Sequence, residues 1–296
     1  CVFSSTDKGG LSQHAIIDSP KWEMFKGVNK LSSLQNTAIY QLGTSGGGNH
    51  FVEWGLVTIS DPNLSSDLEV GETYLALLSH SGSRGIGAKI ADYYSKLAME
   101  LRPDLDSSVK HLAWFNMDTN EGQEYWEAMN FAGEFAEANH HVIHERVSNE
   151  VGIQAVLQIE NHHNFAWIED IQLDDGSIRQ AYVHRKGATP AGNGILGIIP
   201  GSMATNGYIV KGKGNPQSMN SASHGAGRAM SRTKALENIA LSDLRQILKD
   251  ADVDLIGSGN DLNLKSHLDE APQAYKDIET VMSLQTDLVE VVGTFI

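Results

Sequence analysis

The stretch NEGQEYWEAMNFAGEFAEANHHVIHERV (Asn120–Val147) and the section after it decide the fold class. Apolar residues recur along this stretch at helical spacing, and Asn120 with Gln123 three residues later is typical of a capping box, so we expect one long helix. In the section 152–211, short apolar runs alternate with turn residues and predict several strands. A long helix and a series of strands in one chain indicate an α/β or α+β fold and not a four-helix bundle.

The flanking sequence adds one strand and four helices to this expectation. The short apolar run TYLALLS (Thr73–Ser79) ends at a Ser-Gly cluster and predicts a buried strand. Helical spacing of apolar residues predicts a helix over 85–101. We expect further helices at Trp22–Leu34, Leu241–Asp250 and Ala271–Val292.

Composition limits the class of protein. The 296 residues are 41% hydrophobic and 20% charged, which is ordinary for a globular protein and predicts neither disorder nor a coiled coil. No apolar run has the length of a membrane span, no signal-peptide pattern opens the sequence, and a single cysteine cannot form an internal disulfide. The length fits one large domain or two modest ones, and we expect a cytoplasmic protein with no membrane partner.

The local charge differs from the global one. The net charge of −15 argues against a nucleic-acid partner, because phosphates are bound by clustered Lys and Arg. The 51 residues from His184 to Lys234, however, contain no Asp or Glu and seven Lys or Arg. Since nearby charges dominate the field at a site, this glycine-rich section favours binding of a phosphate-bearing substrate. Chance segregation of charge in a loop-rich section is the alternative.

Two glycine-rich motifs carry histidines. GTSGGGNHFVE (Gly43–Glu53) joins a glycine turn, whose backbone N–H groups can approach an anion, to Asn49, His50 and Glu53. In SHSGSRGIG, His80 ends the expected strand, and Arg84 stands before a helix, a position suited to an anion contact. The alternatives are an ordinary turn before a strand and a histidine that serves only the core.

Further motifs follow along the chain. ENHHNF places His162 beside His163, and only one of two adjacent strand residues can face a given site. HRKGATPA and PGSM add cations, hydroxyls and exposed backbone. SASHGAGRAMSR places His224 among small residues, which leave a nucleophile accessible, with Arg228 one helical turn later.

A histidine pair on the long helix is a weaker candidate. His140 and His144 have the i, i+4 spacing of a metal pair, but no HExxH glutamate accompanies them, and we expect their helix face to meet solvent. We assign no role to His14, His111 or His267.

Together and in order, GTSGGGNHFVE, HSGSRGIG, HHN, RKGA, GIIPGSM and SHGAGRAMSRTKA resemble the RtcB family of RNA ligases. The resemblance runs from about Trp22 to the end of the chain. It implies one catalytic domain over residues 1–296, with an α+β fold in which β-sheets form a central sandwich surrounded by helices. It also implies a GTP- and manganese-dependent ligase that joins RNA ending in a 3′-phosphate or 2′,3′-cyclic phosphate to RNA with a 5′-hydroxyl.

The resemblance also implies roles for individual residues. The guanylylated histidine corresponds to His224, and the metal ligands correspond to His50, His80 and His163. We expect RNA phosphates to contact Arg84, Arg185, Lys186, Arg228 and Arg232. The implied nucleotide contacts are Asn49, His50, Phe51, Val52, Glu53, His163, Asn164, Pro200, Gly201, Ser202, Met203, His224, Gly225, Ala226 and Gly227. Imidazole ligands suit manganese and zinc alike, so the ligand type does not select the metal.

The chain departs from the family pattern in three places. The family's metal-bridging cysteine follows an aspartate well upstream of the glycine turn, whereas Cys1 is followed by Val2. The family ends in a Lys-Gly that contacts the nucleotide, whereas this sequence ends at Ile296. The family often has a serine where this chain has Gly207. We expect a chain trimmed at both ends that is guanylylated poorly. Two other functions stay open: a metal-dependent RNA phosphodiesterase that uses no nucleotide, and a nucleotide- or RNA-binding fragment without catalysis.

Overall fold

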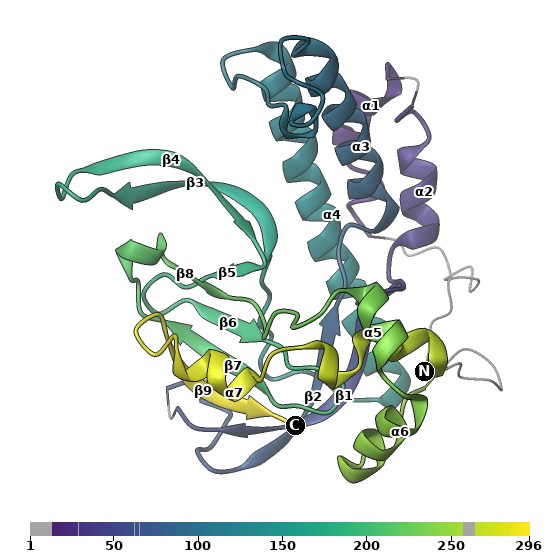
Figure 1. Cartoon of the computed structure of the whole chain (residues 1–296), viewed down its shortest axis with the longest axis vertical. Helices are drawn as coiled ribbons and strands as arrows, with labels where there is room; N and C mark the ends of the chain where they lie inside the picture. Colours follow the sequence, from purple (N-terminus) through teal and green to yellow (C-terminus); the bar gives the residue numbers. More distant parts are fainter. Residues whose placement is uncertain (1–13, 29, 62, 65, 257–263) are drawn as a thin grey trace. The chain divides into compact units, whose positions relative to one another are not determined.

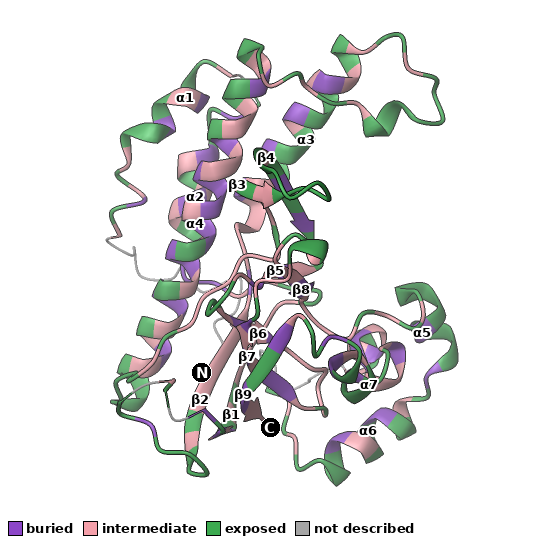
Figure 2. Ribbon diagram, turned by 90° about the vertical axis from the view of Figure 1, so that its left-hand side faces the viewer, coloured by how far each residue is buried: buried purple, intermediate pink, exposed green. Residues whose placement is uncertain are grey.

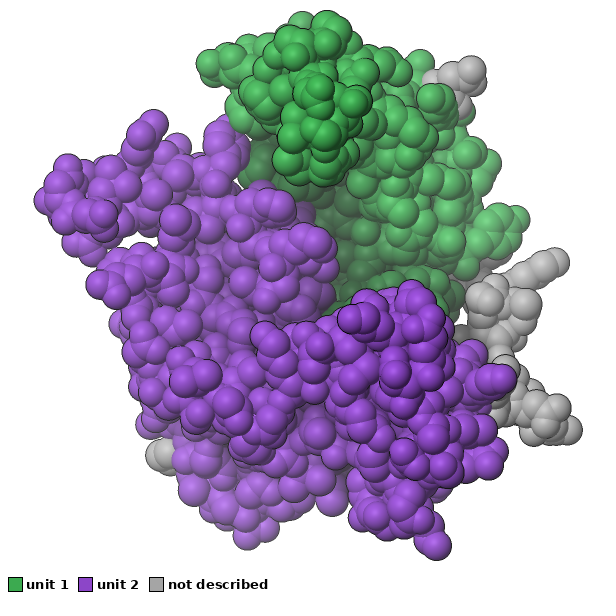
Figure 3. All heavy atoms as spheres, viewed as in Figure 1, with its two compact units in different colours: residues 1, 3–53, 79–154 green, residues 2, 54–78, 155–296 purple. Residues whose placement is uncertain are grey.

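The computed structural model describes residues 14–28, 30–61, 63–64, 66–256 and 264–296. It divides into two compact units (Figure 3). Within the described residues, the first unit comprises residues up to Glu53 together with Ser79–Gln154, and the second comprises Trp54–Leu78 together with Ala155–Ile296. We describe each unit by itself, and the expectation of one catalytic domain over the whole chain stays a prediction.

The first unit is helical (Figure 1). Its elements are η1 (Pro20–Trp22), α1 (Glu23–Lys26), α2 (Leu34–Gln41), α3 (Arg84–Leu101), η2 (Lys110–Leu112) and α4 (Asn120–Val151). The core between the helices is aromatic: the ring of Trp22 meets that of Phe131 edge-on, with centroids 4.6 Å apart. Trp22 also donates its indole N–H to the carbonyl of Ile16 at 2.8 Å, which satisfies its polar atom as burial requires.

Helix α4 is the long helix that the sequence predicts, but it begins differently. Thr119 is the N-cap and accepts from the backbone N–H of Gly122, so the predicted cap at Asn120 is wrong by one residue. The helix ends at Gly152, whose φ of 71° is the left-handed conformation that glycine adopts most readily. Most of its buried residues lie between Ala128 and Val147, and buried residues are purple in Figure 2.

The second unit contains the sheets (Figure 1). Five strands pair in the order β2-β1-β9-β7-β6, and two separate ribbons form from β3 with β4 and from β5 with β8. The strands are β1 (Phe51–Ile59), β2 (Thr73–His80), β3 (Asn164–Gln172), β4 (Ile178–Lys186), β5 (Ala188–Pro190), β6 (Leu196–Ile199), β7 (Gly207–Gly212), β8 (Ser221–Ser223) and β9 (Val289–Phe295). Strands β1 and β2 run across the boundary of the two units.

Short helices complete the second unit. They are η3 (Pro216–Ser218), α5 (Arg232–Asn238), α6 (Leu241–Asp250), η4 (Leu264–Glu270), η5 (Pro272–Ala274) and α7 (Ile278–Ser283). Ile278 and Met282 of α7 join the core of β6, β7 and β9, while α5, α6, η4 and η5 share a second cluster around Leu244 and Leu268. The α+β class is confirmed, whereas a central sandwich of sheets surrounded by helices stays a prediction.

Three predictions of helices and strands need correction. The helix expected at Trp22–Leu34 ends at Gly27, because glycine weakens a helix interior and the chain continues in tighter turns. Strand β2 lies where predicted, but it is not buried, since Leu75 is 59% exposed. The helix expected at Ala271–Val292 is a short helix followed by strand β9, whose β-branched valines pair with β7.

The remaining helix predictions are confirmed. The structure has helix α3 over Arg84–Leu101 and helix α6 over Leu241–Asp250. Among the described residues, no helix is long and apolar enough to cross a membrane.

Candidate functional site

The glycine turn before β1 is shaped by its contact with two functional side chains. Gly46 has a φ of 102°, which side-chain-bearing residues rarely adopt. A Cβ atom built there would lie 1.7 Å from Nη1 of Arg84 and 2.6 Å from Nδ1 of His50. The absence of a side chain at Gly46 therefore lets Arg84 and His50 pack directly over the backbone of the turn.

Arg84 and His80 are the neighbours of His50 in the first unit. Arg84 donates from Nη1 to Nδ1 of His50 at 3.2 Å and from Nε to Oγ1 of Thr44 at 3.2 Å. The rings of His50 and His80 have centroids 6.4 Å apart, and the ring of Phe51 lies 5.5 Å from that of His80. Two metal-ligand candidates of the first unit are thus brought together.

The electrostatics of this cluster favour a neutral imidazole. Burial holds the pKa of His50 below its usual value, and the positive charges of Arg84 and His140 lower it further. A neutral imidazole is the form that binds a metal. Because Nδ1 of His50 accepts from Arg84, its ring proton is on Nε2, and metal binding at either nitrogen requires the guanidinium to leave Nδ1. The donor set fits a divalent transition-metal ion.

The other residues of the first motif differ in exposure. Asn49 is exposed, whereas Phe51, Val52 and Glu53 are half-buried at the start of β1. Burial raises the pKa of Glu53 to about 7, so near neutral pH this side chain exists in both its protonated and its ionised form.

The histidines of α4 lie differently from our expectation. His144 is half-buried and its Nε2 lies 2.8 Å from Oγ of Ser79, and His140 is near enough to His50 to affect its pKa. Only His141 of the three is exposed. The prediction that this helix face meets solvent is therefore wrong for His140 and His144.

The second unit brings His163 next to His224. Their ring centroids are 4.5 Å apart. Gly187 connects them: its N–H donates to the carbonyl of His163 at 2.9 Å, and its carbonyl accepts from the N–H of His224 at 3.3 Å. Gly187 has a φ of 66°, and a Cβ there would lie 3.4 Å from the imidazole of His224. The motifs HHN, RKGA and SHGAGR thus meet at one point of this unit.

The PGSM motif adjoins the same point. A Cβ on Gly225 would lie 3.4 Å from the carbonyl of Pro200, so the turn after His224 passes close to this motif. Gly201 packs against Thr205 and Asn206 so tightly that a Cβ would lie 2.2 Å from a backbone oxygen. In PGSM, the N–H of Ser202 donates to Oγ1 of Thr205, and Met203 packs on the cluster of α5 and α6. In SHGAGR, Ala226 packs on the core of β6 and β7, and Gly227 has a φ of 74°.

Burial lowers the pKa of His224, partly opposed by a backbone hydrogen bond, and the charge of Lys186 lowers it further. His224 is therefore a neutral imidazole near pH 7, the form that can act as a nucleophile. Lys186 itself is exposed and lies 3.5 Å from Oδ1 of Asn164.

Three of the predicted RNA-phosphate contacts have other partners. Arg185 is 3% exposed, forms two hydrogen bonds of 2.7 Å with the carboxylate of Glu169, and donates to Ser221 and Met219. Arg228 donates to the carbonyl of Asp269 and to Tyr275, and Arg232 forms ion pairs with Asp269 and Glu270. Burial and these contacts argue against phosphate binding by Arg185, whereas phosphate binding by Arg228 and Arg232, whose side chains are 25% and 46% exposed, stays a prediction.

The same contacts correct the interpretation of the acid-free section. Within the described residues, four of its seven cations have acidic partners that are distant in sequence: Glu169 for Arg185, Asp61 for Lys211, Glu270 for Arg228, and Asp269 with Glu270 for Arg232. The expected helical turn between His224 and Arg228 is also absent, since β8 ends at Ser223 and α5 begins at Arg232.

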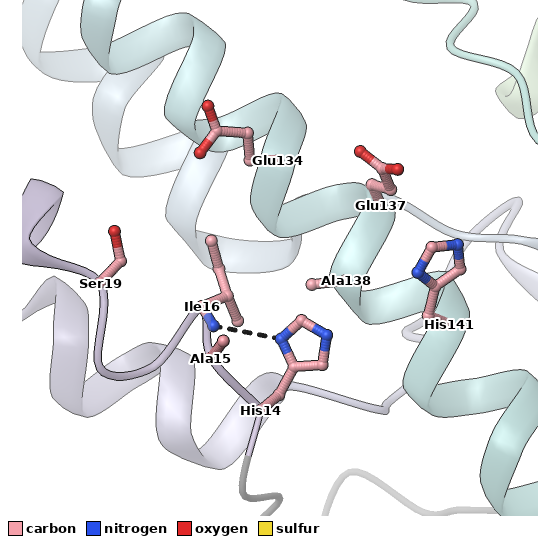
Figure 4. A pocket seen from close by; sticks show the side chains of 8 residues that line it. All are labelled: His14, Ala15, Ile16, Ser19, Glu134, Glu137, Ala138 and His141. Carbon is pink, nitrogen blue, oxygen red and sulfur yellow. Dashed lines mark hydrogen bonds between the residues drawn. The ribbon is translucent and has the colours of Figure 1, made fainter.

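His50 and His80 belong to the first unit and His163 to the second, so the convergence of all three on one metal site stays a prediction. Cys1 lies outside the described residues. A separate cavity of about 350 Å³ opens in the first unit and is lined by His14, Ala15, Ile16, Ser19, Glu134, Glu137, Ala138 and His141 (Figure 4). None of the predicted site residues is among them. Nδ1 of His14 accepts a hydrogen bond from the backbone N–H of Ile16.

Glycine turns that hold neutral histidines, with an exposed lysine beside the candidate nucleophile, suit an enzyme that transfers phosphate-bearing groups. Comparison with known proteins shows the family. The sequence model of the family described as tRNA-splicing ligase RtcB matches residues 9–296. This chain belongs to the RtcB family of RNA ligases.

Named relatives agree with this assignment. The chain is 37% identical to the RNA-splicing ligase RtcB of Escherichia coli K12, over 97% of this chain and 69% of that protein. It is 33% identical to the tRNA-splicing ligase RtcB of Nanoarchaeum equitans, over 84% of this chain and 56% of that protein. It is 31% identical to the RNA-splicing ligase RtcB of Mycobacterium tuberculosis, over 82% of this chain and 60% of that protein.

Proposed function

We propose that this protein is a GTP- and manganese-dependent RNA ligase that joins an RNA 3′-phosphate or 2′,3′-cyclic phosphate end to a 5′-hydroxyl end, with His224 as the nucleophile. Family membership supports the ligase activity. The observation that carries the choice of nucleophile is the position of His224, where HHN, RKGA, PGSM and SHGAGR meet in the second unit.

The proposed reaction has three steps. A nitrogen of the neutral His224 ring attacks the α-phosphorus of GTP, a P–N bond forms, and the bond to pyrophosphate breaks so that pyrophosphate leaves. An oxygen of the RNA 3′-phosphate then attacks the phosphorus of the GMP adduct, which frees His224. Last, the 5′-hydroxyl attacks the activated 3′-phosphate, loses its proton and expels GMP. A cyclic phosphate end is first opened by water.

The residues that hold the nucleotide and metal follow from the two clusters. We assign His50, His80 and His163 to manganese, which when bound would offset negative charge on the transferred phosphate. We assign Lys186 to a phosphate of the nucleotide or RNA, because it is exposed and lies near enough to His224 to lower its pKa. We assign Arg84 to a second phosphate contact, which it can make once it leaves His50.

The test is a ligation assay with the protein expressed from its complete gene. An RNA with a 3′-phosphate and an RNA with a 5′-hydroxyl are incubated with manganese, with or without GTP. We expect a joined product that needs GTP and that His224→Ala abolishes. The matched control is His111→Ala, an exposed histidine of η2 that belongs to none of the motifs, which should ligate normally. Ligation without GTP, or opening of a cyclic phosphate without joining, would instead support a phosphodiesterase. Nucleotide binding with neither reaction would support a binding protein without catalysis.

A further inference from the structure

Asn139 of α4 is a buried polar residue that none of the sequence motifs contains. It is fully buried, and each of its side-chain polar atoms is hydrogen-bonded. Its Oδ1 accepts from the backbone N–H of Gly43 at 2.7 Å and of Thr44 at 3.3 Å. Its Nδ2 donates to the carbonyl of Thr44 at 3.2 Å, to Oγ of Ser81 at 3.1 Å and to the carbonyl of Gly82 at 3.3 Å.

The four residues that accept or donate these five hydrogen bonds belong to the two loops that carry the histidine cluster of the first unit. Gly43 and Thr44 begin the glycine turn that leads to His50, and Ser81 directly follows His80. Ser81 also donates to the carbonyl of Ser45 at 2.7 Å, so the two loops are joined to each other as well as to α4. One amide side chain thus fixes the backbone on both sides of the cluster.

The network continues from Thr44 to the imidazole of His50. Oγ1 of Thr44 donates to the carbonyl of Gln41 at 2.6 Å and accepts from Nε of Arg84 at 3.2 Å. Arg84 in turn donates to His50. Thr44 and Ser81 are each only 6% exposed, so water cannot easily replace a lost partner in this network.

We propose that Asn139 is a positioning residue: it holds the loops of His50 and His80 in place for the binding of divalent metal. The inference rests on the proposed function only in assigning these two histidines to a divalent metal. A metal site loses affinity steeply when its ligands are free to move apart, because binding must then fix them. The helix α4, with its long buried face, supplies the rigid support.

The test measures Mn²⁺ binding alone, without GTP or RNA, through the electron paramagnetic resonance signal of the free ion. In Asn139→Ala we expect Mn²⁺ affinity to fall about ten-fold or more, at a temperature where the variant is folded. The matched control is Ala128→Gly, which weakens the same helix at a fully buried position away from the two loops and should keep its Mn²⁺ affinity.

A second variant and a second measurement keep the proposal testable if Asn139→Ala does not fold. Ser81→Ala removes one hydroxyl and should lower Mn²⁺ affinity by a few-fold. Amide hydrogen exchange of Gly43 and Thr44 should accelerate in Asn139→Ala and not in Ala128→Gly. The proposal is overturned if folded Asn139→Ala, or Ser81→Ala where Asn139→Ala does not fold, binds Mn²⁺ within two-fold of the parent protein. An equal loss in Ala128→Gly would also overturn it. Failure of the ligase proposal would look different, since Mn²⁺ binding would keep its dependence on Asn139 while no ligation occurred.

Discussion

Removal of the Glu169 carboxylate tests the structural role that Arg185 takes in the second unit. The Arg185 side chain is 2% exposed, and Glu169, at 27% exposed, is its ion-pair partner through two parallel hydrogen bonds of 2.7 Å. Glu169→Ala leaves a buried guanidinium whose remaining acceptors, Ser221 and Met219, are neutral. Breaking one side of a buried ion pair costs about 3–5 kcal/mol of stability. Because Glu169 is partly exposed, we expect Glu169→Ala to cost about 3 kcal/mol.

The assay is urea unfolding of the parent, of both single variants and of the double variant. Arg185→Met combined with Glu169→Ala should recover most of the lost stability, because methionine fills the volume without a charge. Arg185→Met should also leave the salt dependence of RNA binding unchanged. A loss below about 1 kcal/mol in Glu169→Ala, or a weaker salt dependence in Arg185→Met, would refute the structural role and return Arg185 to the RNA-contacting residues.

Three further predictions concern the candidate site. Gly187→Ala should destabilise the protein by about 1–2 kcal/mol in urea unfolding, because its φ is positive, and should slow ligation, because the new methyl group meets His224; unchanged ligation would contradict that contact. Because burial raises the pKa of Glu53 to about 7, stability should fall as pH rises from 4.5 towards 7, by at most about 3 kcal/mol. Glu53→Gln should lack this loss in unfolding curves taken at several pH values, and an unchanged pH profile would contradict the shift. Lys186→Ala should reduce the slope of log affinity for single-stranded RNA against log salt by about 0.7, with Lys89→Ala as the control, and an unaltered slope would remove Lys186 from the phosphate contacts.

Sequence patterns predicted best what depends on local chemistry. The helix at 85–101 follows from apolar spacing alone, and the helix at Leu241–Asp250 was also predicted from the sequence. The glycine motifs identified the segments around His50 and His224 because a close approach of backbone requires glycine at particular positions. The helix expected at Ala271–Val292 failed because pairing with β7 overrides a weak helical pattern around the valines of β9.

Contacts between residues far apart in the chain could not be predicted from the sequence. The acid-free section looked like an anion site because Glu169, Asp61 and Glu270 come from outside it, and only folding brings them to their cations. Asn139 gave no signal either, since one asparagine in an amphipathic helix resembles any other until its five hydrogen bonds are known.

The location of the covalent nucleotide tests the assignment of His224 as the nucleophile most directly. The protein from the complete gene is incubated with labelled GTP and manganese, without RNA, and the labelled peptide is sequenced by mass spectrometry under conditions that preserve acid-labile P–N bonds. We predict GMP on His224, in the peptide that contains SASHGAGR, and no adduct in His224→Ala. GMP on another residue, or an adduct that survives His224→Ala, would contradict it.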